Sequence, residues 1–116
     1  MIEVKNLEYR YPKNKKHTVK NISFSISEGE IFGFLGPSGA GKSTTQKILI
    51  KLLTGYTGEV FVFGNDHKKS GKDYFNRIGV CFELPNHYLK LTALENLRYF
   101  AGFYQQCPGN PLHFLQ

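Results

Sequence analysis

Two stretches near the N-terminus alternate apolar and polar residues, which is the spacing of strands that bury one face. The first runs from Ile2 to Tyr9 and the second from Val19 to Ile26. A polar, lysine-rich segment at residues 12–17 separates them. The pattern therefore predicts two half-buried strands that pair in an antiparallel manner.

Three later runs are apolar without alternation, at residues 31–35, 59–63 and 78–82. Short continuous apolar runs are typical of strands buried on both faces, as in a parallel sheet. Cys81 lies in the middle of the third run, where we expect a small, buried apolar side chain. The phenylalanine-rich runs are accordingly assigned to the core.

Helical spacing appears in two longer segments. Residues 42–53 place four apolar side chains on one stripe. A second helix is predicted to begin after Thr92, because Thr92 and Glu95 fit the capping box, in which each side chain satisfies a backbone N–H at the helix start. This second pattern continues to Tyr104, and residues 73–77 favour a single helical turn. Strands and helices together predict the α/β class.

The chain has 116 residues, which allows one domain of ordinary size. Its composition, 41% hydrophobic and 21% charged, excludes disordered, collagen-like and low-complexity classes. No apolar run reaches about 18 residues, so we expect no membrane-spanning segment, and the N-terminus has no apolar signal core. Two cysteines are too few for a disulfide scaffold and favour a reduced, intracellular compartment.

Basic residues outnumber acidic ones, and the chain carries a net charge of +6 when its histidines are neutral. This charge is compatible with nucleic acid, an anionic lipid surface or a phosphorylated ligand, and on charge alone an ordinary basic surface is favoured. The lysines at residues 13–16 and 68–72 are expected to be solvated loop charges. The histidines are scattered without metal-ligand spacing and are expected at the surface: His17, His67, His87 and His113.

Between the runs at 31–35 and 42–53 lies the phosphate-binding P-loop pattern G-x-x-x-x-G-K-[ST]. Its glycines let the backbone bend so that successive N–H groups converge on one anion, and the following helix points its N-terminus at the same phosphates. We expect Lys42 to reach the β- and γ-phosphates, Ser43 to place its hydroxyl on Mg²⁺, and Thr44 to touch the phosphates. The predicted nucleotide-binding residues of this pattern are Gly36, Pro37, Ser38, Gly39, Ala40, Gly41, Lys42, Ser43 and Thr44.

An ordered set of segments around this loop resembles the ATP-binding domain of ABC transporters. The resemblance covers residues 1–104 and implies an α/β P-loop NTPase core, with an incomplete, mostly parallel sheet and an N-terminal antiparallel β subdomain. It implies ATP and Mg²⁺ as cofactors and, for the intact family, ATP hydrolysis coupled to transmembrane transport. Residues 105–116 are expected to form a divergent or disordered tail. The matching segments besides the loop are Leu7–Pro12, Val19–Phe24, Gly29–Leu35, Gly58–Val60 with Gly64, Ile78–Val80 and Leu91–Leu97.

By this resemblance Tyr11 falls where the family keeps an aromatic residue that stacks on adenine; the alternative is that Tyr11 packs beside Pro12. Glu83 falls where the family keeps a glutamine whose amide oxygen lies near Mg²⁺ and the attacking water. A glutamate still accepts from water or binds the metal, but it donates no hydrogen bond while ionised. The resemblance thus implies Lys42 and Glu83 as catalytic residues and Ser43 and Glu83 as metal ligands. The alternative for Glu83 is a surface residue at a strand end.

The irregular stretch Leu84–Leu91 lies where the family receives a helix of its membrane-spanning permease, and packing within a loop is an equal alternative. The resemblance also implies a second ATP-binding subunit in a head-to-tail dimer. It implies a location at the cytoplasmic face of the cell membrane, and no nucleic-acid partner is expected. Some family members linked to drug or ion export look similar at Glu83, which favours an exporter.

Residues 84–116 lack three features that the family uses for hydrolysis: an acidic strand followed by a catalytic glutamate, an LSGGQ-type signature, and a histidine that senses the γ-phosphate. No aspartate follows Asp73. We therefore expect a truncated, N-terminal half of the domain that binds Mg-ATP and hydrolyses it negligibly. Two rival hypotheses are a non-catalytic nucleotide-binding fragment and a small P-loop kinase, which would usually place the loop nearer the N-terminus.

Overall fold

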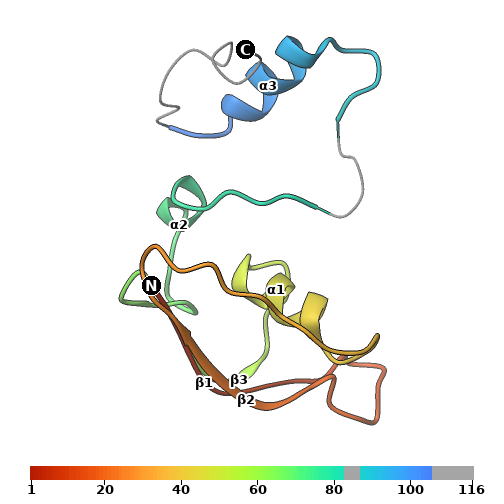
Figure 1. Cartoon of the computed structure of the whole chain (residues 1–116), viewed down its shortest axis with the longest axis vertical. Helices are drawn as coiled ribbons and strands as arrows, with labels where there is room; N and C mark the ends of the chain where they lie inside the picture. The colour runs from red at the N-terminus through yellow and green to blue at the C-terminus, as the bar shows by residue number, and fades with distance from the viewer. Residues whose placement is uncertain (83–86, 106–116) are drawn as a thin grey trace. The chain divides into compact units, whose positions relative to one another are not determined.

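The computed structural model describes residues 1–82 and 87–105, which fall into two units, Met1–Ser70 and Gly71–Gln116. The predicted tail at 105–116 lies outside the described residues except for Gln105. Figure 1 labels helices α1–α3 and strands β1–β3.

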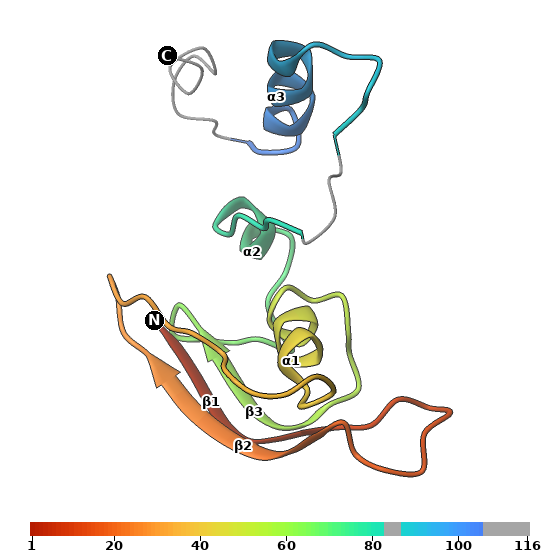
Figure 2. The ribbon, with the colours of Figure 1, turned by 45° about the vertical axis from the view of Figure 1, so that its right-hand side comes forward.

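The first unit is built on an antiparallel sheet with strand order β2–β1–β3–β4 (Figure 2). Its strands are β1 (Ile2–Tyr9), β2 (Val19–Ile26), β3 (Thr57–Val62) and the short β4 (Asn65–Asp66). The predicted antiparallel pair at the N-terminus is confirmed, with Ile2 opposite Ile26 and Val4 opposite Phe24. The strand predicted at 59–63 is present as β3, but it pairs antiparallel with the other edge of β1 and not within a parallel sheet. Strand β1 therefore lies between β2 and β3.

The register of β1 slips in the middle of the strand, and Gly58 on β3 lies at this point. Asn6 has a φ of 49°, and the pairing between β1 and β3 is irregular between Lys5 and Glu8. Gly58 has a φ of 90°, and a Cβ atom there would lie 2.3 Å from the carbonyl oxygen of Asn6. Only glycine fits so close to the neighbouring backbone.

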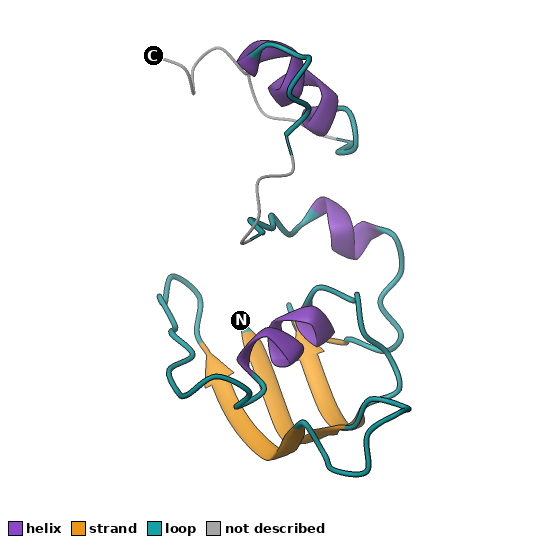
Figure 3. Cartoon of the chain, turned by 90° about the vertical axis from the view of Figure 1, so that its right-hand side faces the viewer, coloured by secondary structure: helices purple, strands orange, loops and turns teal. Residues whose placement is uncertain are grey.

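Helix α1 (Lys42–Leu49) lies over one face of this sheet (Figure 3). It is shorter than the predicted 42–53 because Lys51 adopts a left-handed conformation with a φ of 61°. Ile48 and Leu49, inside the helix, are buried as predicted, whereas Leu52, beyond its end, is exposed. The buried apolar residues of the first unit are Val4, Leu7, Tyr9, Val19, Ile48, Leu49, Tyr56, Val60 and Val62.

Two predicted strands, 31–35 and 78–82, are not strands in the structure. Neither segment pairs with a neighbouring strand among the described residues, and a strand without a partner leaves its backbone N–H and C=O groups to water. Ile31 and Leu35 are therefore exposed. The prediction that Cys81 is buried is wrong for the same reason, since it lies in the second of these segments and is exposed.

The second unit contains the single turn α2 (Asp73–Asn76) and helix α3 (Ala93–Ala101). The predicted capping box at α3 is confirmed: Thr92 N–H donates to the Glu95 carboxylate at 2.8 Å, and Glu95 N–H donates to Thr92 Oγ1 at 3.3 Å. The helix ends at Ala101, before the predicted Tyr104, with Gly102 as its C-cap residue.

Candidate nucleotide-binding site

The loop before α1 has the backbone geometry of an anion cradle. Gly36, Gly39 and Gly41 all have positive φ values, of 149°, 81° and 92°. A Cβ atom on Gly41 would also lie 2.7 Å from the carbonyl oxygen of Thr18, so the loop packs closely against the start of β2. Glycine is thus required here both by conformation and by space.

The side chain of Lys42 folds back over this loop. Its ammonium donates hydrogen bonds to the carbonyl oxygens of Gly36 and Pro37, both at 2.8 Å. These contacts hold the first and last parts of the loop together around one cation. The ammonium therefore lies where a phosphate group in the loop would meet it.

The first turn of α1 carries three hydroxyl side chains and no acidic residue. Ser43 is exposed, Thr44 is buried, and Thr45 Oγ1 donates to the carbonyl oxygen of Gly41 at 3.0 Å. Backbone N–H groups at a helix start attract anions, and a nearby exposed hydroxyl is a ligand that Mg²⁺ accepts. The loop and first turn therefore fit a phosphate group together with a magnesium ion.

Tyr11 is brought to this helix from the loop after β1. Its hydroxyl lies 3.4 Å from the Thr44 hydroxyl oxygen, and its ring meets the Tyr9 ring edge to face, with centroids 5.0 Å apart. Tyr9 is buried, whereas Tyr11 is only partly covered. The structure thus joins Tyr11 to the P-loop helix, and the adenine contact of Tyr11 stays a prediction.

Two other predicted positions are only partly covered by the structure. Glu83 and residues 84–86 lie outside the described residues, so the proposed metal and catalytic roles of Glu83 stay predictions. The described remainder of the proposed partner contact, residues 87–91, is fixed by Asn96 of α3. The Asn96 side chain accepts from Tyr88 N–H at 2.7 Å and donates to the Leu91 carbonyl at 3.2 Å.

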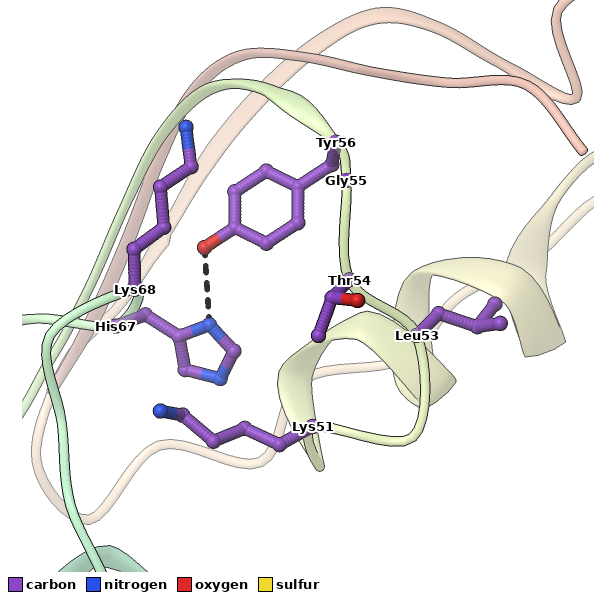
Figure 4. Close-up of a pocket in the computed structure, with 7 residues that line it drawn as sticks. All are labelled: Lys51, Leu53, Thr54, Gly55, Tyr56, His67 and Lys68. Carbon is purple, nitrogen blue, oxygen red and sulfur yellow. Dashed lines mark hydrogen bonds between the residues drawn. The ribbon is translucent and has the colours of Figure 1, made fainter. Parts of the chain in front are cut away.

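The structure corrects one sequence prediction away from the loop: His67 is not a surface histidine. His67 is only 2% exposed and lines a pocket of about 270 Å³ beside the C-terminal end of α1 (Figure 4). A signal for this was present, because a tight turn at Phe63 and Gly64 places His67 opposite the inward-facing Val60, to whose carbonyl the His67 N–H donates.

Comparison with known proteins identifies the family. The family model described as ABC transporter matches residues 19–113. The Fluoroquinolones export ATP-binding protein of Mycobacterium tuberculosis is 51% identical over 115 residues, which are 99% of this chain and 38% of that protein. The bacitracin transport ATP-binding protein BcrA of Bacillus licheniformis is 37% identical over 84% of this chain and 31% of its own length.

Solved structures of ATP-binding cassettes are also similar to this chain. The ATP-binding cassette MJ0796, a dimer in a post-hydrolysis state bound to ADP and Pi, superposes with a TM-score of 0.76 at 31% identity, covering 94% of this chain and 50% of that one. The chain therefore belongs to the ABC transporter family. The predicted P-loop NTPase fold is confirmed, and ATP with Mg²⁺ is the cofactor pair of this family.

The chain spans about two fifths of the length of the first curated relatives and about half of the similar solved cassettes. None of the helices in the described residues is long and apolar enough to cross a membrane. The described residues also hold no group of three or more histidine, cysteine or acidic side chains that could bind a metal ion. Of the two predicted metal ligands, Ser43 lies among the described residues and Glu83 does not.

Proposed function

We propose that this chain binds Mg-ATP through residues 36–44, as part of the ATP-binding subunit of an ABC transporter. Lys42 would pair with the β- and γ-phosphates after giving up its two loop carbonyls, and Thr44 would contact the phosphates from the first helical turn. Ser43 would hold Mg²⁺, with Glu83 as a second ligand; the ion would neutralise phosphate charge. The observation that carries the proposal is the Lys42 ammonium over the glycine loop at the start of α1.

The adenine ring would stack on Tyr11. The contact between the Tyr11 and Thr44 hydroxyls ties this ring to the helix that would hold the phosphates. An aromatic face takes a base ring with little loss of side-chain entropy. The partly covered position of Tyr11 beside the buried Tyr9 leaves part of its ring accessible.

The direct test is calorimetric titration of Mg-ATP into the 116-residue chain. We expect saturable binding to the wild type and its loss in Lys42→Ala, because that variant removes the cation of the loop. Lys47→Ala is the matched control, because it removes an exposed lysine from the same helix, more than one helical turn beyond Lys42. Equal binding by the wild type and Lys42→Ala would refute the proposed site.

The second unit would receive the membrane-spanning subunit. Tyr99 and Phe100 of α3 meet the Tyr88 ring at centroid distances of 4.9 and 6.3 Å. Phe103, just after the helix, meets the Tyr99 and Phe100 rings at 5.2 and 6.5 Å, and all four side chains are exposed. Leu89 beside them is 88% exposed. An exposed aromatic surface of this kind is typical of a protein interface. We propose that residues 84–91 and α3 contact the permease, at the cytoplasmic face of the membrane.

In the whole protein, two such subunits would form a head-to-tail dimer and hydrolyse ATP to drive transport. The similarity to proteins named for fluoroquinolone export and bacitracin transport favours an exporter. Within this scheme residues 1–104 would make the N-terminal half of the ATP-binding domain. A non-catalytic nucleotide-binding fragment is the alternative; family membership speaks against a small P-loop kinase.

A further inference from the structure

A buried histidine connects the far end of α1 to the strand β3. His67, directly after β4, places its Nε2 3.0 Å from the carbonyl oxygen of Leu49, the last residue of α1. Its Nδ1 lies 3.0 Å from the hydroxyl of Tyr56, which comes directly before β3. All three residues are buried, and Figure 4 shows the Tyr56 hydroxyl directed at the imidazole ring.

These two contacts define the protonation state of the ring. A carbonyl oxygen only accepts, so Nε2 carries the hydrogen that it shares with Leu49. In the neutral ring Nδ1 is then an acceptor, and the Tyr56 hydroxyl donates to it. Because the last carbonyls of a helix lack partners within the helix, His67 supplies one to the C-terminal end of α1.

The charges around the ring are predominantly unfavourable to a second proton. Lys51, which follows α1, lies on the side of the ring opposite Tyr56 (Figure 4) and donates to the Ser70 carbonyl at 2.5 Å. Lys68 places its ammonium over the Tyr56 ring, 4.7 Å from the centroid. Asp66 on β4 is the acidic neighbour that acts in the opposite direction.

We propose that Tyr56, His67 and the Leu49 carbonyl form an acid-sensitive latch, which holds the end of the P-loop helix against the β3–β4 hairpin while His67 is neutral and opens when Nδ1 takes a proton from solvent. Protonation turns Nδ1 from an acceptor into a donor, so the hydrogen bond from the Tyr56 hydroxyl is lost. It also places a cation in a buried site beside Lys51. Acid would therefore loosen the helix that begins at the nucleotide loop.

The direction of the effect follows from the burial of the ring. Burial lowers the pKa of His67 below its ordinary value of 6.5, and Lys51 adds to this against the opposing effects of the Leu49 hydrogen bond and Asp66. The folded state then binds the proton less readily than the unfolded state does. The stabilisation is fully present above about pH 6.5 and is lost as the pH falls through the lower, folded pKa.

The test uses urea unfolding of the whole 116-residue chain between about pH 8 and about pH 5, followed through NMR signals of Ile48 and Val60. Below about pH 6.5 we expect the folding equilibrium constant of the wild type to fall by up to about tenfold per pH unit. In His67→Gln the amide can still donate to Leu49 but does not titrate. The pH dependence of its folding equilibrium constant should therefore be smaller by the contribution of one proton. His17→Gln is the control, since it removes an exposed histidine that lies 3.5 Å from Glu8.

A second measurement does not depend on any variant. The imidazole nitrogen shifts of His67 in the wild-type chain should report the Nε2–H form at neutral pH and a titration midpoint below about 6.5. A midpoint at or above that value, an Nδ1–H form, or an unchanged pH dependence in His67→Gln would each overturn the latch. A failure of Mg-ATP binding would not, because the latch concerns the stability of α1 alone.

Discussion

The hydroxyl of Tyr11 lies 3.4 Å from the hydroxyl of Thr44, although 33 positions separate them along the chain. Thr44 belongs to the first turn of α1, directly after the phosphate-binding pattern. The contact therefore joins the aromatic residue proposed for the base to the residues proposed for the phosphates. One nucleotide could place its base against Tyr11 and its phosphates at the start of α1.

The base contact can be tested at Tyr11 itself. Tyr11→Ala should weaken Mg-ATP binding by about tenfold or more, because stacking of a base on an aromatic ring is worth about 1–3 kcal/mol. Tyr11→Phe keeps the ring and should keep most of the affinity. Calorimetric titration measures both, and equal losses in the two variants would show that the hydroxyl, and not the ring, carries the contact.

The close approach of β3 to β1 predicts a large cost at Gly58. Gly58→Ala would place a Cβ atom 2.3 Å from the Asn6 carbonyl and should destabilise the first unit by at least about 3 kcal/mol. Gly64→Ala is the matched control, since Gly64 has a similar φ of 79° and no atom within 4 Å of the added Cβ. It should cost only about 1–2 kcal/mol, the penalty of a left-handed alanine. Urea unfolding measures both, and equal costs would contradict the bulge geometry.

The capping box of α3 predicts a pH effect in the second unit. Hydrogen bonds from the Thr92 backbone and side chain lower the pKa of Glu95 below its usual 4.5. Since the ionised form is the one stabilised, the contribution of the cap is present above about pH 4.5 and is lost as the pH falls through the folded pKa. NMR chemical shifts of residues 93–101 should show fraying of the helix start in acid. In Glu95→Gln that acid-dependent step should disappear.

Removal of the other half of the cap should cost stability at all pH values. Thr92→Ala takes away the acceptor of the Glu95 N–H and should destabilise α3 by about 1 kcal/mol. Amide hydrogen exchange at Glu95 and Asn96 measures the effect. Unchanged protection of these amides would mean that the cap contributes nothing to the helix.

The residues present predict a low hydrolytic rate. The 116-residue chain has no aspartate after Asp73, and its only glutamates beyond that position are Glu83 and Glu95. Phosphoryl transfer needs groups that hold the metal and orient the attacking water. A phosphate-release assay on the purified chain should therefore give a negligible rate even at saturating Mg-ATP. Turnover comparable to that of an intact ATPase would contradict this prediction.

Strands β1 and β2 and the start of α3 could be predicted from the sequence because local patterns determine them. Period-two alternation predicted β1 and β2, and the pair Thr92 and Glu95 predicted the start of α3. The strands predicted at 31–35 and 78–82 were wrong, because a continuous apolar run forms a buried strand only where neighbouring strands are available to pair with it. Such pairing is a long-range property that the run itself does not encode.

The candidate nucleotide-binding site could also be predicted only in part. The P-loop pattern located the glycine cradle and Lys42, because each residue type there is needed by the backbone geometry. The pattern did not predict that Lys42 would bind the Gly36 and Pro37 carbonyls, which depends on how the loop closes. The burial of His67 was missed because a histidine is usually partly exposed, and only the hairpin register places it inside.

The most direct test of the proposed function is to locate the nucleotide on the chain. Backbone amide NMR shifts of the labelled 116-residue chain would be followed as Mg-ATP is added. The largest changes should fall on residues 36–44, with a further change at Tyr11, while α3 should be unaffected. Saturable changes confined to other residues, or no change in the loop at saturating Mg-ATP, would contradict the account.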